Sequence, residues 1–196
     1  MQLIIQFKKK GMVRFLSAIE TSNVVLRTLK RTNLKMEYSQ GFHPAPRVSF
    51  LDSTPTGVID LVLYVAVKVK EFQFTCDEFL QNLRLLTVKG MEPCKVFVND
   101  QNLNTLVTGY EYVVFFREKP DFSRPLEKHS GKMVVPRDLI NMVDEISKRD
   151  YYVVKYTIDK GNIFNPFLFE NTYLAVRTKA FVGNTELNAI LETKAE

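Results

Sequence analysis

The residues best suited to chemistry lie in one short segment, YSQGFHPAPRVSF, at residues 38–50. His43 stands four residues after Ser39 and four before Arg47, with Tyr38 and Phe42 as aromatic neighbours. A hydroxyl and an imidazole so close in sequence could form a nucleophile and its base. Alternating aromatic and basic side chains could instead stack on RNA bases and hold phosphates. A third interpretation is structural, with both aromatic rings folded inward against the preceding helix.

The backbone of this segment is predicted to be stiff. Pro44 and Pro46 each fix their own φ angle, and Gly41 permits a positive φ. Binding residues concentrate on loops that a rigid scaffold holds in place. We therefore expect a defined surface loop here, in which Gly41 allows a left-handed conformation if the turn requires one.

Positive charge is concentrated in the same part of the chain. The protein carries a net +5, but residues 1–50 hold nine basic and two acidic residues, a net +7. Such asymmetry favours a polyanionic partner, although a basic surface can also serve solubility alone. The predicted binding residues for a ligand or RNA are Arg14, Arg27, Lys30, Arg31, Tyr38, Ser39, Gln40, Gly41, Phe42, His43 and Arg47.

Enzymatic signatures are absent from the sequence. There is no P-loop, no GxGxxG, no HExxH and no CxxxCxxC, and neither His43 nor His129 lies near a cysteine. Ser39 or Cys76 could be paired with His43, but nothing else in the sequence supports such a dyad. We predict no catalytic residue, metal or cofactor in this chain, and a non-enzymatic role is favoured.

Hydrophobic periodicity predicts the elements of the first half. Strands are expected at residues 2–8, 12–16, 47–51, 58–70 and 87–98. Capping boxes at residues 17–20 and 75–78 predict helix starts, the first helix reaching about residue 32. Its buried side is expected to hold Ile19, Val25, Leu26 and Leu29. Its exposed basic end, with Arg27, Lys30 and Arg31, could also serve only to complement the helix dipole.

The second half is predicted to repeat this order of elements. Strands are expected at residues 110–117, 151–158 and 173–182, with helices from 136 or 137 to about 148 and from 185 to 192. The aromatic segment at residues 162–171 is interpreted as core in preference to a docking patch.

The predicted fold class is α+β, with two consecutive ferredoxin-like (split βαβ) halves and helices on one face of antiparallel sheets. Residues 1–99 form the basic βαββαβ half, residues 110–196 an α/β half, and residues 100–109 the connector. No signal peptide or membrane span is predicted, and two free thiols favour the cytoplasm.

Three segments resemble a known family: GMVRFLS at residues 11–17, YSQGFHPAPRVSF at 38–50 and the turn at Pro55–Gly57. They are similar to the radical-SAM-linked bacterial domain of unknown function, most clearly over the first 70 residues. The family tends to have histidine and aspartate where this chain has Ala18 and Glu20. The resemblance implies a separate radical SAM protein as partner.

Charge, aromatic loop and resemblance together predict an auxiliary RNA-recognition module. It would present substrate to the radical SAM protein, in RNA modification. Two alternatives stay open: a small-molecule or enzymatic domain centred on His43 and Arg47, and a purely protein-binding adaptor.

Overall fold

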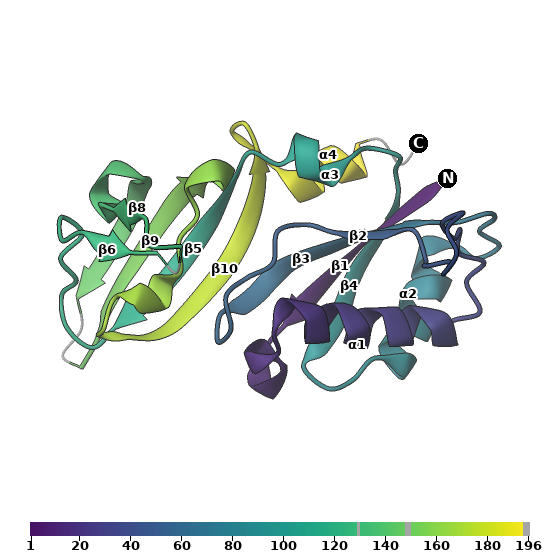
Figure 1. Cartoon of the computed structure of the whole chain (residues 1–196), viewed down its shortest axis with the longest axis horizontal. Coiled ribbons are helices and arrows are strands. Elements are labelled where there is room, and N and C mark those ends of the chain that lie inside the picture. The colour runs from purple at the N-terminus through teal and green to yellow at the C-terminus, as the bar shows by residue number, and fades with distance from the viewer. Residues whose placement is uncertain (129, 148–149, 194–196) are drawn as a thin grey trace.

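The computed structural model describes residues 1–128, 130–147 and 150–193. Its dominant feature is one nine-stranded, mostly antiparallel sheet with a few helices, so the protein is of mixed α/β class. The main strand order is β4-β1-β3-β10-β5-β9-β8, and the sheet runs through the length of the molecule (Figure 1). In the described residues, no helix combines the length and the apolar character needed to cross a membrane.

The first half of the sheet is built around β1 (Gln2–Lys9), which is antiparallel to both β3 (Ile59–Lys68) and β4 (Met91–Val98). The short β2 (Val48–Phe50) pairs with the end of β3. Alternate residues of β1 face opposite sides, as the strand period requires. Leu3, Ile5 and Phe7 join the core beneath the two long helices, whereas Ile4 joins the core on the other face.

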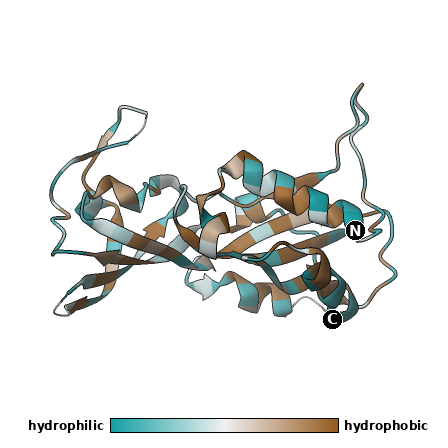
Figure 2. Ribbon diagram, turned by 90° about the horizontal axis from the view of Figure 1, so that it is seen from below, coloured by the Kyte–Doolittle hydropathy of each residue, from teal (hydrophilic) through white to brown (hydrophobic). Residues whose placement is uncertain are grey.

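Both long helices begin as their capping boxes predict. In α1 (Ala18–Arg31), the Ser17 hydroxyl accepts from the Glu20 amide at 3.2 Å, and the Glu20 carboxylate accepts from the Ser17 amide at 2.8 Å. Thr75 and Glu78 make the same reciprocal contacts at α2 (Cys76–Leu86). Figure 2 shows alternating hydrophilic and hydrophobic residues along the helices.

The prediction of a buried Ile19 was wrong. Val25 and Leu29 are fully buried, but Ile19 is 75% exposed. Six residues before Val25, it lies about 120° around the helix from that side chain. The predicted strand at residues 12–16 was also wrong, because Gly11–Phe15 forms a 3₁₀ helix that starts at a positive φ of 61°.

The second half of the sheet consists of four antiparallel strands in the order β10-β5-β9-β8. They are β5 (Gly109–Phe116), β8 (Ile140–Ser147), β9 (Tyr152–Asp159) and β10 (Thr172–Val182). A separate hairpin joins β6 (Leu126–Glu127) to β7 (Met133–Val134), and β11 (Thr185–Glu186) pairs with the end of β10. Short 3₁₀ turns lie at Pro136–Asp138, Lys160–Asn162 and Pro166–Leu168.

The predicted helix from residue 136 or 137 to about 148 was wrong over the described residues. A 3₁₀ turn at Pro136–Asp138 leads directly into β8, which pairs with β9 from Ile140 to Ser147. The edge of β9 satisfies the backbone groups of this segment, and that pairing outweighs a weak helical spacing of apolar residues. The second half therefore does not repeat the helix–strand order of the first.

Helices cover both faces of the first half, not one as predicted. Valines and leucines of α1 and α2 pack on one face. The short helices α3 (Leu103–Leu106) and α4 (Leu187–Glu192) contribute Leu103, Leu187 and Leu191 to the core on the other face (Figure 1). The aromatic segment at 162–171 belongs to this second core, since Phe164 and Phe169 are buried there.

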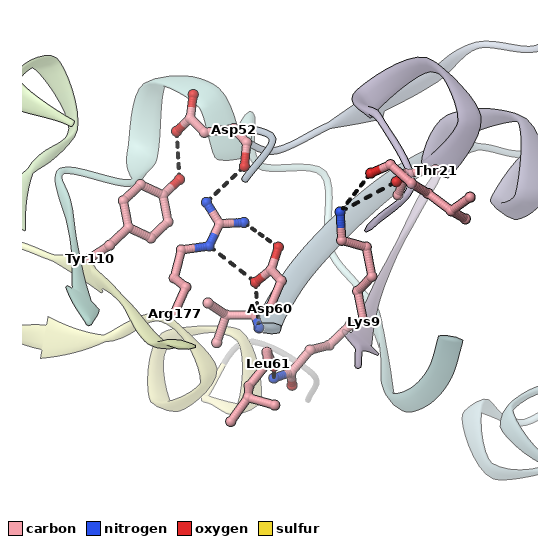
Figure 3. A network of polar contacts seen from close by, with 10 residues as sticks. Lys9, Thr21, Asp52, Asp60, Leu61, Tyr110 and Arg177 are labelled. Carbon is pink, nitrogen blue, oxygen red and sulfur yellow. Dashed lines mark hydrogen bonds and ion pairs between the residues drawn. The ribbon is translucent and has the colours of Figure 1, made fainter. Parts of the chain in front are cut away.

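A buried ion pair lies where the two halves of the sheet meet. β10 runs parallel to β3 through the pairs Val176–Ile59 and Arg177–Asp60. Arg177 donates to the Asp60 carboxylate from Nε at 3.0 Å and from a terminal nitrogen at 2.5 Å, and to the Asp52 carbonyl at 2.7 Å (Figure 3). Arg177 and Asp60 are both inaccessible to solvent, so each charge depends on the other.

Replacing Arg177→Met should lower the free energy of unfolding by about 3–5 kcal/mol, because Asp60 would remain buried without its counter-charge. Urea denaturation followed by circular dichroism measures the loss. Lys179→Met, two residues along β10 and partly exposed, is the matched control and should cost less than about 1 kcal/mol. Equal losses in the two variants would show that the buried pair has no special role.

Candidate functional site

The segment singled out by the sequence forms a two-stranded arm, residues 37–47. Its base is hydrogen-bonded to the edge of β3, since the Glu37 amide donates to the Lys68 carbonyl at 2.8 Å and the Lys68 amide to the Arg47 carbonyl at 2.9 Å. Further out, Tyr38 bridges to Pro46, and the Ser39 amide donates to the Ala45 carbonyl at 2.9 Å. The arm projects from the end of the molecule that carries the N-terminus (Figure 2, upper right).

The tip of the arm presents aromatic rings to solvent. Phe42 is 96% exposed and Tyr38 45% exposed, so neither ring folds inward against α1. The rings of Phe42 and His43 meet edge to face, with centroids 5.0 Å apart. Tyr38, Gln40, Phe42 and His43 are thus all exposed on the arm, and the last two contact each other.

The polar groups of the arm mostly support its own shape. The Ser39 hydroxyl accepts from the Ala45 amide at 3.0 Å, and Arg47 pairs with Glu37 at 3.4 Å. Neither dyad with His43 gains support: the Ser39 hydroxyl contacts backbone, and partial burial of Cys76 raises the pKa of its thiol. His129 lies outside the described residues.

The turn of the arm does not use the positive φ that Gly41 permits. The φ of Gly41 lies outside the positive range, and a Cβ built there meets nothing within 4 Å. A positive φ is found at Gly57, where φ is +94° and a Cβ would lie 3.1 Å from the Phe167 ring, so a side chain there would be strained. Gly57 also donates its amide to the Arg14 carbonyl at 2.9 Å, which joins the turn at residues 55–57 to the 3₁₀ helix.

Four of the predicted basic binding residues lie in two separate places, at the two ends of α1. Arg27, Lys30 and Arg31 are exposed near the end of α1 from which the chain continues into the arm. Arg14 precedes the opposite end of this 14-residue helix, about 20 Å away. Its guanidinium lies 4.5 Å from the centre of the Phe15 ring. Arg14 therefore does not belong to the arm surface.

Sequence reasoning missed a buried polar cluster beneath α1. Lys9, one residue beyond the strand predicted at residues 2–8, is the last residue of β1 and only 2% exposed. Its ammonium reaches the Leu16 carbonyl at 3.3 Å and the Thr21 hydroxyl at 3.5 Å (Figure 3). The available signal was charge within apolar strands, at Asp60 and Arg177.

The pKa of Lys9 reflects this environment. Burial lowers it from the ordinary value, Asp60 opposes that effect, and Arg177 reinforces it. Burial also works against the charge on Arg177, but Asp60, Tyr112 and Tyr110 together outweigh it, and the pKa of Arg177 is raised. The Asp60 carboxylate is thus paired with Arg177, whereas the Lys9 ammonium makes only two long hydrogen bonds, both to uncharged oxygens.

The fold and these two sites describe a mixed α/β protein with an exposed aromatic arm and a buried polar cluster. The chain belongs to the family described as "Uncharacterized protein conserved in bacteria" (DUF2344), whose profile matches residues 2–170. The match extends well beyond the first 70 residues and covers the arm, α1 and most of the second half. A search of curated proteins found no match. In the described part of the chain, no group of three or more His, Cys, Asp or Glu side chains could hold a metal ion.

Alanine substitutions at two glycines should show which position requires a residue without a side chain. Gly57→Ala should lower the free energy of unfolding by roughly 1–3 kcal/mol, because it forces a side chain into a positive φ against Phe167. Gly41→Ala is the matched control and should stay within about 0.5 kcal/mol of the original protein. Thermal or urea unfolding measures both, and a costly Gly41→Ala would contradict the open conformation of the arm.

The buried Lys9 should give a pH-dependent stability. Because its folded-state pKa is lowered, the unfolded chain binds more protons between that pKa and 10.5. The original protein should therefore gain stability relative to Lys9→Met as the pH rises towards 10.5. Urea unfolding of both proteins at several pH values measures the difference. A difference that falls as the pH rises would show that the folded protein favours the charged lysine.

Proposed function

We propose that this protein is an auxiliary RNA-recognition module that presents substrate to a separate radical SAM protein in RNA modification. The observation that carries the proposal is the exposed arm tip, with Phe42 at 96% exposure beside His43. Water disfavours so exposed a ring, and stacking on an unpaired base would remove it from water. Each such stack contributes about 1–3 kcal/mol in proteins that bind single strands.

The charge next to the arm supports RNA as the partner. Arg27, Lys30 and Arg31 are exposed near the end of α1 that leads to the arm. Cations beside stacking rings are the arrangement by which proteins hold phosphates and bases of a single-stranded loop together. Complementing the helix dipole accounts for their position on α1, but it does not account for the exposed rings on the arm.

The domain assignment forms part of the proposal. We infer a ferredoxin-like unit over residues 1–99, a connector at 100–109 and a second α/β unit at 110–196. The order β4-β1-β3-β2, with antiparallel neighbours throughout, supports the split βαβ arrangement of the first unit. A cytoplasmic location belongs to the same proposal and rests on the free cysteines.

The radical SAM partner rests on the resemblance, and one surface is suited to protein contact. Met12, Phe15 and Ile19 are 81%, 49% and 75% exposed, and all three lie at or next to the GMVRFLS segment. This exposed apolar group also favours the second candidate, a protein-binding adaptor. The third, a small-molecule or enzymatic site at His43 and Arg47, has weaker support because both side chains are open to solvent.

RNA binding can be tested with an RNA hairpin that carries an unpaired loop, in a filter-binding assay at several salt concentrations. Phe42→Ala and Arg31→Glu should each weaken binding by about tenfold, and affinity should fall steeply with salt. Melting should change little, because both side chains are exposed.

Arg137→Glu, an exposed charge reversal in the second half, is the matched control and should bind as the original protein does. Binding that salt does not weaken, or that survives Phe42→Ala and Arg31→Glu together, would show that the arm is not an RNA surface.

A further inference from the structure

A cavity of about 230 Å³ lies between the first turns of α1, β3 and the segment after β2. Ala18 and Ser53 are exposed at its rim, while Lys9, Thr54 and Asp60 in its lining are buried. Its volume corresponds to roughly eight water molecules in the liquid. A small organic molecule can therefore fit here.

Two buried polar groups in this lining lack adequate partners. The Thr54 hydroxyl oxygen finds no hydrogen-bond partner in the described part of the chain, although Thr54 is only 7% exposed. Lys9 is 2% exposed and has only the 3.3 and 3.5 Å contacts to neutral oxygens. A buried ammonium needs a counter-charge, and a buried hydroxyl without a partner costs stability.

The surrounding charges define which ligand would complete these groups. Asp60 is already bound by Arg177 through two hydrogen bonds and by the Val62 amide at 3.0 Å. That pair is neutral overall, which leaves Lys9 as the cavity's uncompensated charge. A monoanion balances it, whereas a dianion would leave one buried negative charge without a partner.

The remaining walls favour an organic anion over an inorganic one. Ala18, Phe50, Leu51 and Leu63 line the cavity beside the polar groups. A carboxylate has two oxygens that can accept from the Lys9 ammonium and from the Thr54 hydroxyl. A short hydrocarbon portion would then contact these apolar side chains.

We propose that this cavity binds a small monocarboxylate, held by Lys9 and Thr54, with its hydrocarbon portion against the apolar wall. The proposal goes beyond RNA recognition and does not depend on it, because the arm contributes no residue to the cavity. It assigns Lys9 as a binding residue for the ligand's charge.

The test is calorimetric titration of the full chain with butyrate, with butyramide as the uncharged control of nearly the same shape. Chloride is exchanged for butyrate so that ionic strength stays constant. Butyrate should bind and raise the melting temperature, and butyramide should do neither at the same concentrations. Charge recognition by Lys9 predicts this difference.

Two variants and one control connect the binding to the cavity. Lys9→Met should weaken butyrate binding by at least about tenfold, and Thr54→Val by roughly three- to tenfold. Lys8→Met, the neighbouring β1 lysine that lines a different pocket, should bind as the original protein does. Thr54→Val removes a single hydroxyl, so it keeps the test informative if Lys9→Met fails to fold.

Three results would overturn the proposal: no butyrate binding by the original protein, equal binding of butyrate and butyramide, or butyrate binding unaffected by Thr54→Val and by folded Lys9→Met. None of these outcomes bears on RNA binding, which the arm variants test separately.

Discussion

The buried pair of Arg177 and Asp60 is the interaction on which the rest of this architecture depends. It lies where β10 meets β3, the one parallel contact between the two halves of the sheet in the described residues. Since two charges there are removed from water, the strands are stable side by side only in the register that lets each charge find the other. The third strong bond, from Arg177 to the Asp52 carbonyl, also fixes the segment that leads from β2 towards the cavity.

The pair also determines the chemistry of its surroundings. With Asp60 taken by Arg177, Lys9 has no carboxylate of its own among the described residues and remains a buried cation beside an open volume. Lys9 thus lacks a counter-charge because the pairing of β10 with β3 brings Arg177 to Asp60. This cavity contains a cation, an unpartnered hydroxyl and an apolar wall, and its polar groups are buried. The arm differs because its rings face bulk water.

β3 connects these two places. Its outer end, at Lys68, holds the base of the arm, and its first residues carry Asp60 beneath α1. The arm depends on backbone hydrogen bonds to an otherwise open strand edge, so its position follows from the sheet. Its tip is open at Gly41, where a built Cβ would meet nothing within 4 Å.

Local interactions allowed the sequence alone to predict much of the first half. Capping boxes set the starts of α1 and α2, alternation identified β1 and β3, and the prolines and aromatic residues identified the arm. Sequence did not predict β8, since the edge of β9 decides that segment's hydrogen bonds. It also did not predict the exposure of Ile19, which lies about 120° around α1 from the buried Val25. The cluster of Lys9, Asp60 and Arg177 was also decided by tertiary structure alone. Lys9 lies near the start of the chain and Arg177 near its end, and they meet only because β10 pairs with β3, a contact that no local pattern encodes.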